Sequence, residues 1–264
     1  MIQKSPTSKL VIHVLNLERS PARWKFVEQQ LDRHGLTPIK VVAVDGKLLT
    51  DEEINNHYDN LENRHKYFWP LKRSEIGCFL SHRKSMLKFI NDGKAECLLL
   101  VEDDIQVEQK FSDHIDQWVN LLRGKEPVCL KLFTKRSISG KVVAKIAGVN
   151  VIRPNRVPLG CVAQLLNRAA AQRFLDKSER FSVPIDVLYQ QWWKHKVDIL
   201  CTESSLFVEV SHLLGGTNIG GSDDLSAIQK IKRELGRSWF RLKLSTTSRV
   251  LRLFKKNKAS KPCT

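Results

Sequence analysis

The segment that most constrains the fold is ECLLLV, a run of six residues at positions 96–101. After its first residue the run is wholly apolar, as expected of a strand whose two faces are both buried. It therefore predicts a central strand in a sheet that helices cover on both sides. Three acids follow directly, Glu102, Asp103 and Asp104, so a buried strand and a polar cluster share one boundary.

Apolar, β-branched segments alternate with segments of helical periodicity along the rest of the chain. Residues 9–17 predict a strand, after which Ser20-Pro21 opens a helix that closes at Gly35. Ser74 begins a second helix, which Gly93 ends. Further strands are predicted at 38–46, 128–133, 141–153, 161–166, 197–202 and 206–210, and further helices at about 112–123, 167–177 and 184–195. The polar stretch 48–70 predicts a loop with some helix. This order predicts an α/β fold with a mostly parallel sheet.

Charge is spread unevenly along the chain. The 264 residues contain 44 Lys plus Arg and 28 Asp plus Glu, a net charge of +16, and are 42% hydrophobic. That hydrophobic content excludes a disordered chain but leaves a nucleic-acid-binding protein open. Residues 225–264 hold 12 basic residues and one acid, so 12 − 1 gives +11 for this segment alone. We therefore predict a globular body at 1–222 and a basic extension at 223–264.

The basic extension has the pattern of an amphipathic helix. Its apolar residues recur every three or four positions at Leu225, Ile228, Ile231, Leu235, Trp239 and Leu242. A basic amphipathic helix with aromatic residues is typical of binding to an anionic membrane surface, here through residues 225–258. The alternative is a helix packed on the body with a solvated basic face. The chain has no apolar run long enough to span a bilayer and no CxxC spacing among its six cysteines, which predicts a cytoplasmic protein with reduced thiols.

The three acids at 102–104 predict a ligand site. Ligands of open α/β sheets bind at the carboxyl ends of the strands. Alternation along a strand places Glu102 and Asp104 on the same side, where a hard divalent cation is the natural counter-charge. The alternative is a solvated strand end whose acids cap the segment that follows.

Three further motifs carry polar residues. In EIGCFLSH, residues 75–82, Ser81 and His82 are adjacent on a helix and do not face each other, which excludes a hydrolase dyad. Asp186 follows a proline in VPID, where it is either a helix-dipole partner or a general base. GGTNIGG at 215–221 predicts a flexible loop that could close over a site.

Taken in order, VLNLERSPARW, VVAVDG, SEIGCFLSH, LLLVEDDI and VPID resemble the motifs of glycosyltransferase family 25. This is the lipooligosaccharide galactosyltransferase family of Gram-negative bacteria, which is related to the collagen galactosyltransferases. The likeness covers roughly residues 9–190. It implies a GT-A-like nucleotide-sugar-binding fold, inverting chemistry and a divalent metal, Mn²⁺ or Mg²⁺.

The resemblance also implies roles for particular residues. Asp104 and Glu102 match the acidic metal motif, and His212 is a late-chain candidate for a third metal ligand. Asp186 matches the position of the general base, with Glu75 next in line. The residues matched to donor binding are Asn16, Arg19, Arg23, Asp45, Ser81, His82 and Asp103.

The expected activity is transfer of a hexose from UDP-galactose or another UDP-hexose to a lipid-linked core oligosaccharide. The product would be a β-linked sugar on lipopolysaccharide or lipooligosaccharide, made at the cytoplasmic face of the inner membrane. Two alternatives remain open. One is a nucleic-acid-binding protein that uses the basic extension, although its acids at 102–104 would repel phosphate unless a metal were bound. The other is a metal-dependent nucleotide-sugar hydrolase, which would release sugar without an acceptor.

Overall fold

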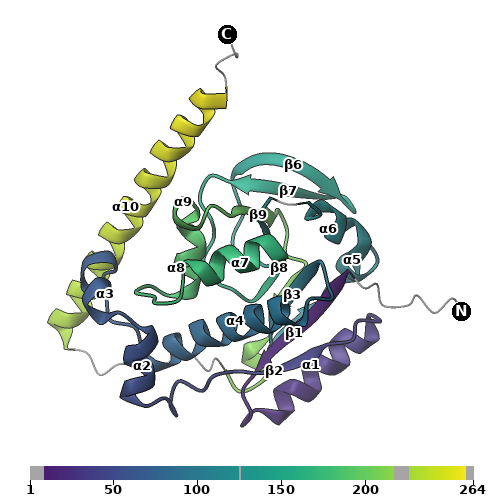
Figure 1. Cartoon of the computed structure of the whole chain (residues 1–264), viewed down its shortest axis with the longest axis horizontal. Helices are drawn as coiled ribbons and strands as arrows, with labels where there is room; N and C mark the ends of the chain where they lie inside the picture. The colour runs from purple at the N-terminus through teal and green to yellow at the C-terminus, as the bar shows by residue number, and fades with distance from the viewer. Residues whose placement is uncertain (1–8, 125, 217–225, 260–264) are drawn as a thin grey trace, which may run out of the picture.

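The computed structural model describes residues 9–124, 126–216 and 226–259, and within them a large sheet forms the centre of the molecule (Figure 1). The sheet is eight-stranded, in the order β2-β1-β3-β8-β5-β9-β7-β6. A second sheet pairs β4 with β10. The strands are β1 (Leu10–Asn16), β2 (Ile39–Val42), β3 (Cys97–Glu102), β4 (Ile105–Val107), β5 (Val128–Lys131), β6 (Gly140–Ile146), β7 (Val149–Pro154), β8 (Ala163–Asn167), β9 (Asp198–Thr202) and β10 (Phe207–Glu209).

The large sheet is mixed, not mostly parallel as the sequence predicted. Strand β1 is parallel to β2 and β3, and β5 is parallel to β9. Strand β8, however, runs antiparallel to both β3 and β5, and β7 runs antiparallel to β6 and β9. An apolar run records burial but not direction, so β8, which is buried along its whole length, has the same sequence pattern as a parallel strand.

Helices cover both faces of the sheet (Figure 1). Strand β3 shows why: Leu98 and Leu100 belong to one core cluster, whereas Leu99 and Val101 belong to the other. The first cluster is closed by α4, α7 and α8, and the second by α1, α5 and α6. The helices are α1 (Pro21–Arg33), α2 (Asp51–His57), α3 (Asn60–Lys66), α4 (Arg73–Asp92), α5 (Gln109–Ser112), α6 (Ile115–Leu121), α7 (Arg168–Asp176), α8 (Ile185–Gln190), α9 (Trp192–His195), η1 (Ser211–Leu213) and α10 (Ala227–Ala259). The prediction of a central strand buried on both faces is confirmed.

Most predicted elements occur where the spacing indicated, with local differences. The helix expected at 112–123 is divided into α5 and α6, and the polar stretch 48–70 forms α2 and α3. Strand β4, of three residues, was not predicted. The boundary predicted at residue 222, and most of the GGTNIGG loop, lie outside the described residues.

Helix α10 runs along the outer edge of the molecule, beside the segment that follows α3 (Figure 1). It packs on the body through Phe240, whose ring lies 5.0 Å from that of Tyr67, and through Ser248, which accepts a 3.1 Å hydrogen bond from Trp192. Among the described residues, no helix is both long and apolar enough to span a membrane. The described cysteines are all free thiols, while Cys263 lies outside this part of the chain.

Candidate active site

Strands β1, β2 and β3 end at the same edge of the sheet because they are parallel. A cavity lies at this edge, between the start of α1 and the first turns of α4. The loop after β2 and the acids after β3 form two of its walls. Of the predicted site residues, it is lined by Arg19, Arg23, Asp45, Ser81, Glu102, Asp103 and Asp104. We call this the donor cavity, after the donor-binding roles expected from the sequence for most of these residues. The fold thus gathers seven residues that the sequence spreads over more than eighty positions.

Two glycines allow α4 to approach the loop that follows β2. A Cβ on Gly46 would lie 1.9 Å from the carbonyl oxygen of Arg73, and one on Gly77 would lie 2.7 Å from the amide nitrogen of Gly46. Ser81 holds the same contact: its hydroxyl donates to the Gly77 carbonyl (2.7 Å) and accepts from the Val44 amide (2.8 Å). This packing explains the glycines of the VVAVDG and SEIGCFLSH motifs, which meet in space.

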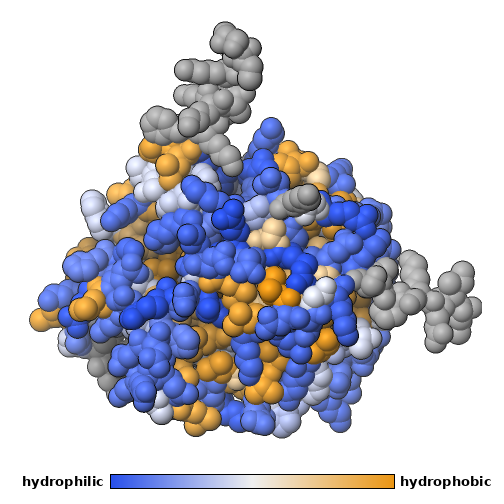
Figure 2. Space-filling model, in the orientation of Figure 1, coloured by the Kyte–Doolittle hydropathy of each residue, from blue (hydrophilic) through white to orange (hydrophobic). Residues whose placement is uncertain are grey.

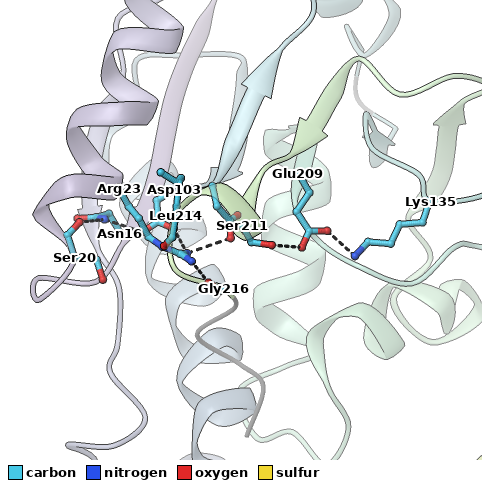
Figure 3. Close-up of polar contacts among 10 residues, drawn as sticks. Asn16, Ser20, Arg23, Asp103, Lys135, Glu209, Ser211, Leu214 and Gly216 are labelled. Carbon is cyan, nitrogen blue, oxygen red and sulfur yellow. Dashed lines mark hydrogen bonds and ion pairs between the residues drawn. The ribbon is translucent and has the colours of Figure 1, made fainter.

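Arg23, on α1, connects the acids to the segment that follows η1 (Figure 3). Its guanidinium donates to Asp103 (3.0 Å) and to Asp104 (3.1 Å), and it also donates to the carbonyls of Leu214 and Gly216. Asn16 donates a 2.7 Å hydrogen bond to the other oxygen of Asp103. Asn16 and Arg23 of the N-terminal motif therefore hold Asp103. The hydrogen bonds of Arg23 also hold the segment after η1 close to the acids.

Glu102, Asp103 and Asp104 place three carboxyl groups in the site, and the single positive charge of Arg23 cannot balance all of them. Burial raises the pKa of Glu102 to about 8, and the charges of Asp104, Asp103, Glu209 and Asp186 add to the shift. The pKa of Asp104 is also raised, by burial first, although Arg23 opposes that shift. One oxygen of Asp104 is buried and has no hydrogen-bond partner. Unpaired carboxylate oxygens in an acidic pocket fit a hard divalent cation.

Other predicted metal-site and donor residues take different positions. Cys78, His82 and Glu102 bring one ligand atom each within 4.8 Å of one another. His82 is fully buried, its pKa is lowered to about 3 by that burial, and its Nδ1 contacts Gln164 at 3.3 Å. His212 lies on η1 with an exposed side chain and does not line the donor cavity. Asn16 and His82 do not line the donor cavity either, because both side chains are buried in the protein interior.

Arg19 and Asp45 form an ion pair at the mouth of the donor cavity, 2.5 Å apart. The hydrogen bond to Arg19 is the largest cause that lowers the pKa of Asp45, and the same bond raises the pKa of Arg19. The pair joins the loop before α1 to the loop after β2. It presents one cationic and one anionic group to a ligand in the cavity.

A second cavity, of about 210 Å³, adjoins the first and contains Asp186. We call it the base cavity, after the general-base role expected from the sequence for Asp186. Glu102 and Cys78 line both cavities, so the two cavities adjoin at these side chains. One Asp186 oxygen accepts a 3.1 Å hydrogen bond from the Gly160 amide. Glu75 also lines the base cavity, but one of its oxygens accepts from the Lys72 amide (2.8 Å) and caps α4.

Two charged residues that lie near Asp186 were not predicted from the sequence, namely Lys131 and Glu209. Lys131 is buried in β5, where its ammonium donates to the carbonyls of Pro158 (2.6 Å) and Gly160 (2.5 Å). It therefore holds the loop that contacts Asp186. Glu209 on β10 faces the same cavity and pairs with Lys135 at 2.5 Å (Figure 3). A lysine inside the apolar run VCLKLF was a signal for the first; no signal marked the second.

The fold and the site define an α/β protein with an acidic cleft at the carboxyl ends of parallel strands. The family model described as glycosyltransferase family 25 (LPS biosynthesis protein) matches residues 9–189. The chain belongs to this family.

Similar proteins include a glycosyltransferase 25 family member of Aedes aegypti, 32% identical over 127 residues, which are 44% of this chain and 20% of that protein. Procollagen galactosyltransferase 2 of Homo sapiens is 33% identical over 121 residues, which are 40% of this chain and 18% of that protein. The chain thus spans about a fifth of the length of these relatives. A solved glycosyltransferase involved in glycosylation of the major capsid of PBCV-1 has a TM-score of 0.41 at 10% identity, over 87% of this chain and 99% of that one.

Proposed function

We propose that this chain is an inverting, metal-dependent hexosyltransferase. It moves galactose, or another hexose, from a UDP-sugar to a lipopolysaccharide core or lipooligosaccharide acceptor. The observation that carries the proposal is the acidic cluster at the end of β3, which lines the cavity formed by the family's N-terminal motifs. The raised pKa of Glu102 and the unpartnered oxygen of Asp104 support a cation at this cluster.

In this proposal the donor cavity holds the nucleotide of a GT-A-like donor site. Glu102 and Asp104 hold Mn²⁺ or Mg²⁺, with His212 as a further candidate ligand. A bound cation would stabilise negative charge on the departing diphosphate. Arg19 and Asp45 contact the nucleotide from the loops, while Arg23 and Asn16 hold Asp103 in place. The printed name of the human relative supports galactose as the first donor sugar to test.

In this proposal Asp186 acts as the general base. The acceptor hydroxyl gives its proton to Asp186 as its oxygen bonds to the anomeric carbon, and the bond from that carbon to the UDP oxygen breaks. The electron pair of the broken bond leaves with UDP, and attack from the opposite side inverts the anomeric centre to a β-linkage. Lys131 holds the Gly160 carbonyl, and the Gly160 amide fixes one oxygen of Asp186 and leaves the other for the acceptor.

We further propose that α10 docks the protein on the anionic cytoplasmic face of the inner membrane, where a lipid-linked acceptor lies. The predicted apolar stripe points away from the body, because Ile228, Ile231, Leu235, Trp239 and Leu242 are 59–69% exposed. Figure 2 shows apolar residues interrupting the hydrophilic surface along the edge that α10 occupies. Exposed lysines at 230, 232 and 243 border the stripe and suit anionic lipid.

The transferase proposal is tested by UDP release from purified protein with Mn²⁺ and a panel of UDP-sugars, with and without truncated lipopolysaccharide core. We expect one sugar to give acceptor-stimulated release that EDTA abolishes. Asp186→Asn should lower turnover about 10²- to 10⁴-fold and leave donor binding intact. Asp32→Asn, on the exposed surface of α1, is the matched control.

The outcomes separate the candidate functions. Release of UDP and free sugar without an acceptor would establish the hydrolase instead. Silence with every donor, together with salt-dependent binding of nucleic acid, would favour the nucleic-acid-binding alternative. Normal turnover by Asp186→Asn would transfer the base role to Glu75.

A further inference from the structure

A third cavity, of about 380 Å³, lies where α10 packs on the body, and nothing above assigns it a role. Its aromatic wall comes from Tyr67 and Phe68, after α3, and from Phe240 on α10. The three rings contact one another, with centroids between 4.4 and 5.8 Å apart. Flat, rigid apolar walls of this kind suit the C–H faces of a sugar ring.

The rest of the wall is strongly cationic. Arg156, Arg237 and Arg241 line the cavity from two different segments, the loop after β7 and helix α10. Arg237 pairs with Glu234 and lies over the Phe68 ring. Neither Arg156 nor Arg241 forms an ion pair with a residue in the described ranges, and the pKa of Arg156 is lowered by burial and by the charge of Arg241. Two guanidinium groups that repel each other beside a cavity favour an anion between them.

The cationic cavity adjoins the base cavity. Glu75 lines both of them, and the base cavity in turn shares Glu102 with the donor cavity. The cationic cavity shares no lining residue with the donor cavity. A ligand in it would therefore lie beside the cavity that contains Asp186 and apart from the donor site, as an acceptor does.

We infer that the cationic cavity binds an anionic substituent, a phosphate or a carboxylate, on the acceptor oligosaccharide. The inference rests on the proposed transferase function and names the chemical class of its acceptor. Planar guanidinium groups bind phosphate and carboxylate oxygens in pairs. The aromatic wall would hold the ring that carries the charged group, while the neighbouring sugar presents its hydroxyl to Asp186.

The test uses the full chain with Arg156→Gln and Arg241→Gln combined, because both side chains are exposed enough for the fold to survive their loss. Arg249→Gln, on the same helix and outside the cavity, is the control. Acceptors are a lipid-free phosphorylated core oligosaccharide and the same compound after phosphatase treatment. We expect the double variant to raise the KM for the phosphorylated acceptor about tenfold or more, with kcat within about twofold, and to leave the KM for the dephosphorylated acceptor unchanged.

Calorimetric binding of the phosphorylated oligosaccharide, without donor or metal, separates this inference from the proposed function. Binding that is lost in the double variant supports the cavity even if no turnover is found. Equal KM values for wild type and variant with both acceptors would overturn it while leaving the transferase intact. Equal losses with both acceptors would assign the bound group as a carboxylate, which phosphatase leaves in place. Displacement of the oligosaccharide by a short single-stranded DNA at comparable affinity would also overturn it. Carboxylate and phosphate are distinguished by whether phosphatase treatment removes binding.

Discussion

Single residues in this protein show how burial sets charge. His13, His82 and His195 are fully buried, and burial is the main cause that lowers their pKa to about 4, 3 and 4. Each is therefore neutral in the folded protein at neutral pH. In the unfolded chain a histidine takes up a proton near pH 6.5. The unfolded state thus binds more protons as the pH falls below that value.

The sign of the resulting pH dependence follows from linkage. When the unfolded state binds the extra proton, the free energy of unfolding rises with pH. The contribution of His82 to this free energy is therefore complete above about pH 6.5 and is lost as the pH falls toward about 3. We expect His82→Gln to flatten the dependence of unfolding free energy on pH by about 1.4 kcal/mol per pH unit between pH 6 and 4.5. Urea unfolding across this range measures it.

Glu102 has the opposite dependence, because its pKa is raised in the folded state. Between about pH 4.5 and 8, Glu102 therefore binds a proton in the folded state but not in the unfolded chain. This contribution to the free energy of unfolding favours the folded state as the pH falls. It is present in both proteins and cancels when His82→Gln is compared with wild type. The exposed His65 provides His65→Gln as the control for replacing a histidine. Parallel curves for wild type and His82→Gln would contradict the assignment.

At the scale of elements, α4 positions more of the site than any other helix described here. It contributes Glu75 to the base cavity and Ser81 to the donor cavity, and Cys78 to both. Its N-terminal half can reach the loop after β2 only because Gly46 and Gly77 lack a Cβ. The loop carries Asp45, so the contact between the helix and the loop sets the width of the donor cavity.

Gly77→Ala tests this contact. Alanine favours a helix by about 1 kcal/mol over glycine, yet its Cβ would lie 2.7 Å from the Val44 carbonyl oxygen. We expect the clash to dominate, with a net loss of about 1–3 kcal/mol in unfolding free energy and weaker donor binding. Thermal unfolding and UDP titration measure the two effects. Leu87→Ala, at an exposed position on α4, is the control. A stabilised Gly77→Ala protein with unchanged UDP affinity would contradict the prediction, because it would show that the loop after β2 moves aside freely.

At the scale of the whole molecule, α10 has two different faces. One face packs on the body and closes the cationic cavity with Arg237, Phe240 and Arg241. The other face carries the exposed apolar stripe. In the membrane proposal, a lipid-linked acceptor enters from the same surface on which this helix docks. This arrangement joins the membrane proposal to the acceptor proposal in one element.

The membrane proposal predicts that Leu235→Ser combined with Trp239→Ser abolishes sedimentation with phosphatidylglycerol-containing vesicles. Loss of two large apolar side chains removes about 3–6 kcal/mol of transfer free energy. UDP release with a lipid-free acceptor should be unchanged. Leu61→Ser, which replaces an equally exposed leucine on α3, is the control. Undiminished vesicle binding, or a change from dimer to monomer by light scattering, would instead assign the stripe to another role or to a second copy of the chain.

The sequence by itself determined the spans of the main elements, the double burial of β3 and most charged residues of the donor cavity. The elements and the acids depend on local spacing, because periodicity reports burial and the acids adjoin the strand that positions them. The other predicted charged residues of the cavity followed from the resemblance of the motifs to the family. Only the tertiary structure decided the reversed direction of β8, the pairing of Arg23 with Asp103 and Asp104, and the role of Lys131 at the Gly160 loop. It also decided which face of α10 meets the body. Each of these joins residues far apart in the chain, and such contacts depend on how all the elements pack together, which no local pattern records.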